Sequence, residues 1–139
     1  ESILARADRL AGRGVFRHPP LAHGAGALAE TLKGARVMLY RGDPGETFCL
    51  AVAEAQALGV AEAQALGVPA VVMPLGALAE RVIDGVTGCV AASEEAFADA
   101  AIALLREDDL WLCRHRAALD RQRGLSWDEV AARFEGLLR

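Results

Sequence analysis

Short apolar runs alternate with longer segments of helical periodicity along the chain. The apolar runs predict strands, and the periodic segments predict helices. We expect strands at residues 15–17, 36–40, 68–73 and 89–91. We expect helices at residues 2–11, 27–33, 77–82, 94–106, 110–123 and 127–139, and a long alanine-rich helix that begins near Glu46. Because apolar strands alternate with helices, the pattern indicates an α/β fold with a parallel sheet covered on both faces.

Capping residues mark the ends of several of these helices. Ser93 is expected to cap the helix at 94–106. Residues 126–129 have the pattern of a capping box that opens the last helix. The first helix is expected to bury one side, which carries Ile3, Leu4 and Leu10.

The loop at residues 42–45, Gly-Asp-Pro-Gly, joins the strand at 36–40 to the alanine-rich helix. In parallel sheets a ligand binds at the carboxyl ends of the strands, where this loop is expected. A helix N-terminus after such a loop offers unpaired backbone N–H groups to an anion such as phosphate. Glu46 falls in the first helical turn, where a carboxylate suits the helix dipole.

Glu46 and Glu54 form a spaced pair of carboxylates on this helix. Eight residues separate them by about 12 Å along the axis and about 80° around it. The pair could hold two ends of an elongated ligand. With 19 acidic residues in the chain, a chance pair of solvated carboxylates is an equal alternative from spacing alone.

The residues around this pair form an ordered series: Glu-Thr-Phe from residue 46, Glu-Ala-Gln-Ala-Leu-Gly from residue 54, Gly-Val-Pro-Ala-Val-Val from residue 67, then Gly76, Glu80, Asp84-Gly85 and Gly88. Over roughly residues 15–139 this series resembles the donor-binding domain of family 4 retaining glycosyltransferases with the GT-B fold. The resemblance implies one partial donor-binding domain over residues 1–139, with C-terminal helices at 110–139. Its fold would be a Rossmann-like parallel sheet flanked by helices, an incomplete half of a GT-B fold.

The resemblance also implies transfer of a hexose from a nucleotide-sugar to an acceptor hydroxyl. Glu46, assigned to the catalytic site, would hold the donor sugar hydroxyls, and Glu54 would hold the ribose hydroxyls. Backbone N–H groups would face the sugar and diphosphate, and they belong to Thr47, Phe48, Cys49 and Leu50. No metal or other cofactor is expected.

Cys49, Arg17 and His18 are further candidates for contact with the ligand, and each has an alternative explanation. The family usually has glycine where Cys49 stands, so the Cys49 side chain could crowd the sugar, or the substitution could be typical of a subfamily. A role for its thiol as a nucleophile is the least favoured explanation. Arg17 and His18 lie in the loop expected near the base, and we favour a solvated loop for them.

One eight-residue sequence, Ala-Glu-Ala-Gln-Ala-Leu-Gly-Val, occurs twice in succession, at residues 53–60 and 61–68. Deleting one copy restores the helix-to-strand junction of the resembled family, so one copy is expected to be an insertion. A natural slip, an engineered duplication and a sequence error each account for it. We favour an arrangement in which the first copy ends the helix and residues 60–68 bulge out, with Glu54 on the ligand side. In the rival arrangement the second copy takes that place, and Glu54 and Glu62 become the spaced pair.

Composition excludes several classes of protein. The formal net charge of −4, with both signs interspersed, argues against nucleic acid as a partner. The three cysteines lack paired metal spacing, which favours a reduced, cytoplasmic setting.

The resemblance leaves the amino-terminal acceptor domain and the start of the donor domain unaccounted for. We therefore expect no transferase activity from the chain alone, and self-association through an open sheet edge is possible. A second hypothesis is that the chain is a non-catalytic folding or assembly protein, in which the duplicated helix segment shows how a fold absorbs an insertion. A third is a related GT-B enzyme, such as a sugar epimerase or phosphorylase.

Overall fold

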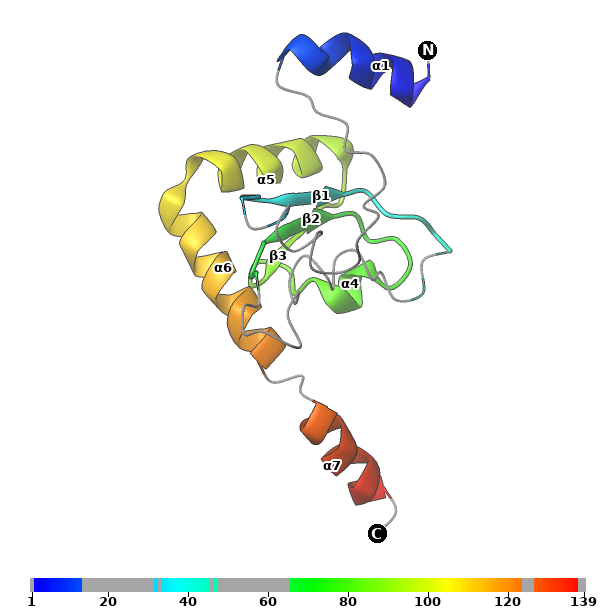
Figure 1. The fold of residues 1–139 in the computed structure, drawn as a ribbon, viewed down its shortest axis with the longest axis vertical. Coiled ribbons are helices and arrows are strands. Elements are labelled where there is room, and N and C mark those ends of the chain that lie inside the picture. The colour runs from blue at the N-terminus through cyan, green and yellow to red at the C-terminus, as the bar shows by residue number, and fades with distance from the viewer. Residues whose placement is uncertain are drawn as a thin grey trace.

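In the computed structural model, the described residues form a three-stranded parallel sheet at the centre of the fold (Figure 1). The structure describes residues 2–13, 32, 34–45, 47, 66–123 and 127–137. The strands, in the spatial order β1-β2-β3, are β1 (Met38–Tyr40), β2 (Ala70–Val72) and β3 (Gly88–Val90). The α/β class and the parallel, Rossmann-like sheet predicted from the sequence are confirmed.

β2 is the central strand because its side chains avoid water on both faces. Ala70, Val71 and Val72 are all 0% exposed. Pro69 has no N–H to donate, and its carbonyl oxygen accepts the N–H of Met38 at 2.9 Å. The ladder therefore begins after Pro69, and the strand is shorter than the predicted 68–73.

Helices cover both faces of the sheet (Figure 1). On one face, Leu78 of α4 (Leu78–Arg81) and the adjacent Val82 pack against Ala70 and Val72 of β2. Because side chains alternate along a strand, Val71 points to the opposite face. There α5 (Glu94–Arg106) contacts β2 and β3, and α6 (Asp108–Arg123) packs on α5. The expectation of a doubly covered sheet is confirmed.

The terminal helices lie at opposite ends of the molecule (Figure 1). α1 (Ile3–Leu10) continues into the 3₁₀ turn η1 (Ala11–Arg13), and α7 (Trp127–Leu137) follows α6. Ser2, predicted as helical, instead caps α1 by accepting the N–H of Ala5 at 3.2 Å. Leu10 is half-buried rather than buried. Three predicted features lie outside the described residues: the strand at 15–17, nearly all of the helix at 27–33 and the capping residue of α7.

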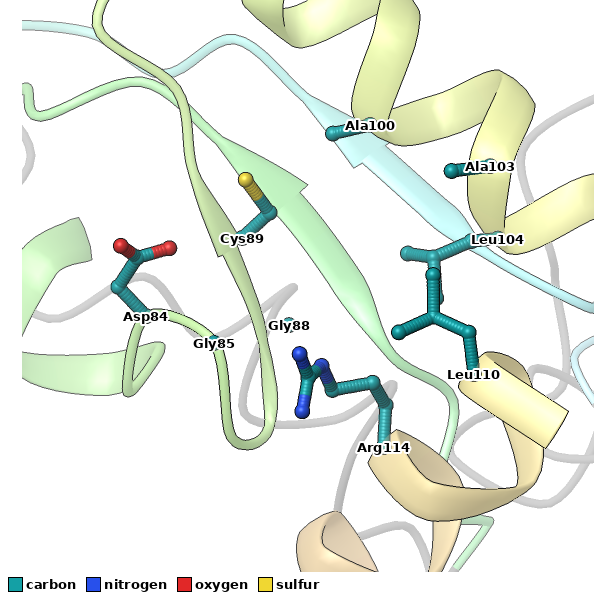
Figure 2. Close-up of a pocket in the computed structure, with 9 residues that line it drawn as sticks. All are labelled: Asp84, Gly85, Gly88, Cys89, Ala100, Ala103, Leu104, Leu110 and Arg114. Atoms are coloured by element: carbon teal, nitrogen blue, oxygen red, sulfur yellow. The ribbon is translucent and has the colours of Figure 1, made fainter. Parts of the chain in front are cut away.

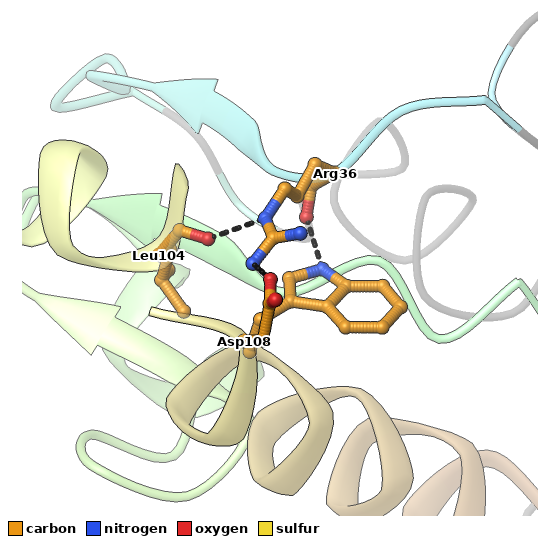
Figure 3. A network of polar contacts seen from close by, with 4 residues as sticks. Arg36, Leu104 and Asp108 are labelled. Carbon is orange, nitrogen blue, oxygen red and sulfur yellow. Dashed lines mark hydrogen bonds and ion pairs between the residues drawn. The ribbon is translucent and has the colours of Figure 1, made fainter. Parts of the chain in front are cut away.

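A polar network fastens α5 and α6 to the start of β1 (Figure 3). The Nε of Arg36 donates to the carbonyl oxygen of Leu104 at 2.8 Å, and its guanidinium pairs with Asp108 at 2.6 Å. The indole Nε1 of Trp111 donates to the carbonyl oxygen of Arg36 at 2.7 Å. The Arg36 guanidinium also lies 5.2 Å from the centre of the indole, a cation–π contact.

The same network continues to the start of β2. The His115 ring stacks on Trp111 with ring centres 4.7 Å apart, and its Nδ1 donates to the carbonyl oxygen of Gly67 at 2.8 Å. α6 therefore holds the amino ends of two neighbouring strands, which leaves the carboxyl ends at the other edge of the sheet.

The N-terminus of α5 is capped as the sequence predicts. Ser93 has extended backbone, and its Oγ accepts the N–H of Ala96 at 3.1 Å. The pKa of the Glu95 carboxyl is lowered by its own backbone hydrogen bond and then by a hydrogen bond from Ser93.

Replacing Ser93 by alanine is expected to lower the free energy of unfolding by about 1 kcal/mol, because the N–H of Ala96 loses its partner. The pKa of Glu95 should rise toward its ordinary value in the variant. Chemical denaturation and a carboxyl NMR titration measure the two effects, and Ser93→Asp, which retains a capping oxygen, is the control. An unchanged stability in Ser93→Ala would contradict this account of the cap.

Candidate ligand-binding edge of the sheet

The carboxyl ends of the three strands meet at one edge of the sheet. β1 is followed by residues 41–45, β2 by residues 73–77 and β3 by residues 91–93. Ligands of open parallel sheets bind outside this edge, between the loops. The candidate site is therefore built from these three loops.

The first loop lies against the second because of Gly42. Its φ of +93° is a conformation that glycine adopts without strain. A Cβ at this position would overlap the Cδ1 atom of Leu78 and would lie 3.4 Å from Leu75. Glycine at position 42 thus allows the backbone after β1 to pack on the segment that leads into α4.

The same loop turns sharply just before the predicted site residues. The Oδ1 atom of Asp43 accepts the backbone N–H of Gly45 at 2.7 Å, which closes a turn around Pro44. The exposed residues 43–45 present this turn to solvent. The turn predicted from the Gly-Asp-Pro-Gly sequence is confirmed.

An ion pair connects the first loop to the third. A guanidinium nitrogen of Arg41 lies 2.7 Å from the Glu94 carboxylate, at the start of α5. Both side chains are more than half exposed, so the pair adds little stability. Arg41 was not among the predicted site residues, although its position directly after a strand places it at this edge.

Most of the predicted site residues lie outside the described part of the chain. Thr47 is described and is exposed. The other predicted site residues lie outside the described residues: Glu46, Phe48, Cys49, Leu50 and Glu54. Arg17 and His18, for which a solvated loop was favoured, lie outside them as well. Their roles stay predictions.

The last residues of the second repeat are packed in the fold, which corrects the expected bulge. Residues 60–68 were expected to bulge out, but Gly67 is buried and Val68 is only 3% exposed. The Gly67 φ of +58° and its bond to His115 fix the turn into β2. Since only the second copy is followed by the apolar strand, Leu66, Gly67 and Val68 form the junction with β2. The positions of Glu54 and Glu62 lie outside the described residues.

Among the residues that the structure describes, no three His, Cys, Asp or Glu side chains are grouped so as to hold a metal ion. Among the helices of the same residues, none combines the length and the apolarity that crossing a bilayer requires.

Comparison with known protein families identifies a matching family model. The family model described as "Glycosyl transferases group 1" matches residues 5–107. That range contains all three strands and the three loops at their carboxyl ends. No curated protein matches the chain.

Proposed function

The chain belongs to the group 1 glycosyl transferases, and from that premise we propose that it is the donor-binding domain of a retaining enzyme. The donor is a nucleotide-sugar, and the transferred group is a hexose that passes to an acceptor hydroxyl. The observation that carries the proposal is the glycine loop at residues 42–45, which follows β1 at the carboxyl edge of the sheet. Position 46, the first of the proposed site residues, comes directly after this loop.

The proposed chemistry uses carboxylates and backbone N–H groups. Glu46 accepts hydrogen bonds from the donor sugar hydroxyls, and Glu54 accepts them from the ribose hydroxyls. Charge-assisted hydrogen bonds of this kind are stronger than neutral ones. The backbone N–H groups of residues 47–50 stabilise the charge that develops on the leaving diphosphate. The exposure of Thr47 supports this role, because a ligand could reach its backbone.

The acceptor is proposed to bind to a further domain, so that this chain alone transfers no sugar. Within the described residues, β1 pairs only with β2, and Leu39 of β1 is 51% exposed. This supports completion of the sheet by a segment outside the described residues or by another chain.

The tandem repeat offers a matched pair of variants for testing the ribose site. Glu54 and Glu62 occupy the same position in identical eight-residue segments. Glu54→Ala is expected to weaken nucleotide binding by about tenfold or more, the loss of one charged hydrogen bond. Glu62→Ala should change it by less than about twofold, which is the scale of a solvated surface residue.

Isothermal calorimetry with UDP, GDP and ADP measures both effects and identifies the base. A larger loss in Glu62→Ala would transfer the ribose role to the second copy, which already forms the junction at Gly67. If none of the three nucleotides binds, the donor-site proposal is overturned.

A non-catalytic folding or assembly protein is the second candidate, and the repeat favours it. The junction after the second copy is buried and hydrogen-bonded, which supports a fold in which the repeat leads directly into β2. This candidate predicts no saturable binding of any nucleotide, so the same titration separates the two functions.

A further inference from the structure

A cavity of about 150 Å³ opens beside β3, on the flank of the sheet rather than at the carboxyl edge (Figure 2). It lies between β3, the turn before this strand and the helices α5 and α6. The lining residues are Asp84, Gly85, Gly88, Cys89, Ala100, Ala103, Leu104, Leu110 and Arg114. Neither the proposed donor site nor the Arg36 network accounts for this space.

One wall of the cavity is apolar and made partly of small side chains. Ala100 and Ala103 are neighbours on one face of α5, because residues three apart on a helix lie side by side. Leu104 and Leu110 extend this wall toward α6. An apolar cavity of about 150 Å³ is large enough for a benzene-sized molecule. The wall therefore suits a compact apolar group.

Arg114 supplies a positive charge beside this wall. Its side chain is half-buried, and it makes no hydrogen bond or ion pair with any residue that the structure describes. In Figure 2 its side chain extends from α6 toward Gly88 at the start of β3. Burying part of a guanidinium costs free energy that a hydrogen-bonded anion offsets. Its planar fork matches a carboxylate, which can accept two parallel hydrogen bonds.

The other two polar side chains of the cavity make no hydrogen bond or ion pair with Arg114. Asp84 is exposed, and its Oδ1 accepts the N–H of Val90 at 2.9 Å. Burial raises the pKa of the Cys89 thiol, and the nearby Asp84 charge raises it further. Cys89 therefore remains a neutral thiol near pH 7. Within the described part of the chain, the charge on Arg114 therefore remains open to a carboxylate ligand.

We propose that this cavity binds a small monocarboxylate with a compact apolar body, of about the size of benzoate. The carboxylate pairs with the guanidinium of Arg114, and the apolar body packs on Ala100, Ala103 and Leu104. Binding is non-covalent and is independent of the proposed donor site.

Calorimetry with benzoate and with benzamide tests the charge requirement. Benzoate is expected to bind saturably, and benzamide, which has a similar shape but no charge, at least about tenfold more weakly. Arg114→Gln should weaken benzoate binding by a similar factor. Arg116→Gln is the matched control, since Arg116 is an exposed arginine of the same helix that does not line the cavity. Equal binding of the two ligands, or equal losses in the two variants, would overturn the proposal.

A second measurement uses the wild-type chain and so does not depend on the folding of a variant. Cys89 lines the cavity, whereas Cys113 is exposed on α6 and does not. Saturating benzoate should slow alkylation of Cys89 several-fold and leave Cys113 unchanged, as measured by mass spectrometry of the labelled peptides. Unchanged alkylation of Cys89 would place the ligand elsewhere and contradict the proposal.

Discussion

Replacing Gly67 by alanine is expected to lower the free energy of unfolding by about 3 kcal/mol, the sum of backbone strain and overpacking. The Gly67 φ of +58° is unfavourable for any residue with a Cβ. An added Cβ would lie 2.6 Å from the Cγ of Leu119 and 2.8 Å from the Nδ1 of His115. Both neighbours belong to α6, so the substitution pushes this helix away from the start of β2. Urea denaturation measures the loss.

The first repeat again supplies a matched control. Gly59 has the same neighbours in sequence, so Gly59→Ala makes the same chemical change eight residues earlier. We expect Gly59→Ala to cost less than Gly67→Ala, because the apolar strand follows only the second copy. An equal or larger cost for Gly59→Ala would contradict the assignment of Gly67 to the junction.

Removing the Arg36 side chain is expected to cost about 2–3 kcal/mol, since it breaks a charged hydrogen bond and a cation–π contact. Its Nε donates to the carbonyl oxygen of Leu104, which ends up without this partner in Arg36→Ala. The Arg36 side chain is 33% exposed, so its contacts are partly shielded from water. Thermal or urea unfolding of the variant measures the effect.

Two further substitutions separate the parts of this network. Asp108 is 89% exposed, so Asp108→Ala should cost less than about 1 kcal/mol despite the 2.6 Å ion pair. Trp111→Phe retains an aromatic ring but removes the indole N–H, and should cost about 1–2 kcal/mol. If Asp108→Ala destabilises as much as Arg36→Ala, the exposed ion pair, and not the partly buried contacts of Arg36, would supply most of the stabilisation.

Local patterns in the sequence were sufficient to predict much of the fold. The helix α5 has the predicted bounds because Ser93 caps it and the residues that follow favour a helix. The three described strands were found from their apolar runs, each within two residues of its ends. Two strands were predicted too long. β1 begins after Arg36 because the carbonyl oxygen of Arg36 accepts the indole N–H of Trp111, a contact with a distant residue. β2 begins after Pro69 because Pro69 lacks an N–H.

Contacts between distant residues could not be predicted in this way. Arg36 and Asp108 are 72 residues apart, and nothing near either residue in the sequence indicates its partner. The junction at Gly67 was placed in a bulge because the two repeats are identical, and its contact with His115, 48 residues away, has no signal in the nearby sequence. For the candidate site, the sequence predicted the turn at 42–45, and the structure confirms it. The six predicted site residues beyond this turn remain predictions, apart from the exposure of Thr47.

The most direct test of the proposed donor site is an NMR titration of the ¹⁵N-labelled chain with UDP, GDP and ADP. We predict that one of these nucleotides shifts the amide signals of the carboxyl-edge loops, including Arg41, Gly42, Gly45 and Thr47. The amides of Gly85 and Cys89, at the separate cavity beside β3, should stay unchanged. Shifts confined to that cavity, or no shifts with any nucleotide, would contradict a nucleotide-sugar site at the carboxyl edge of the sheet.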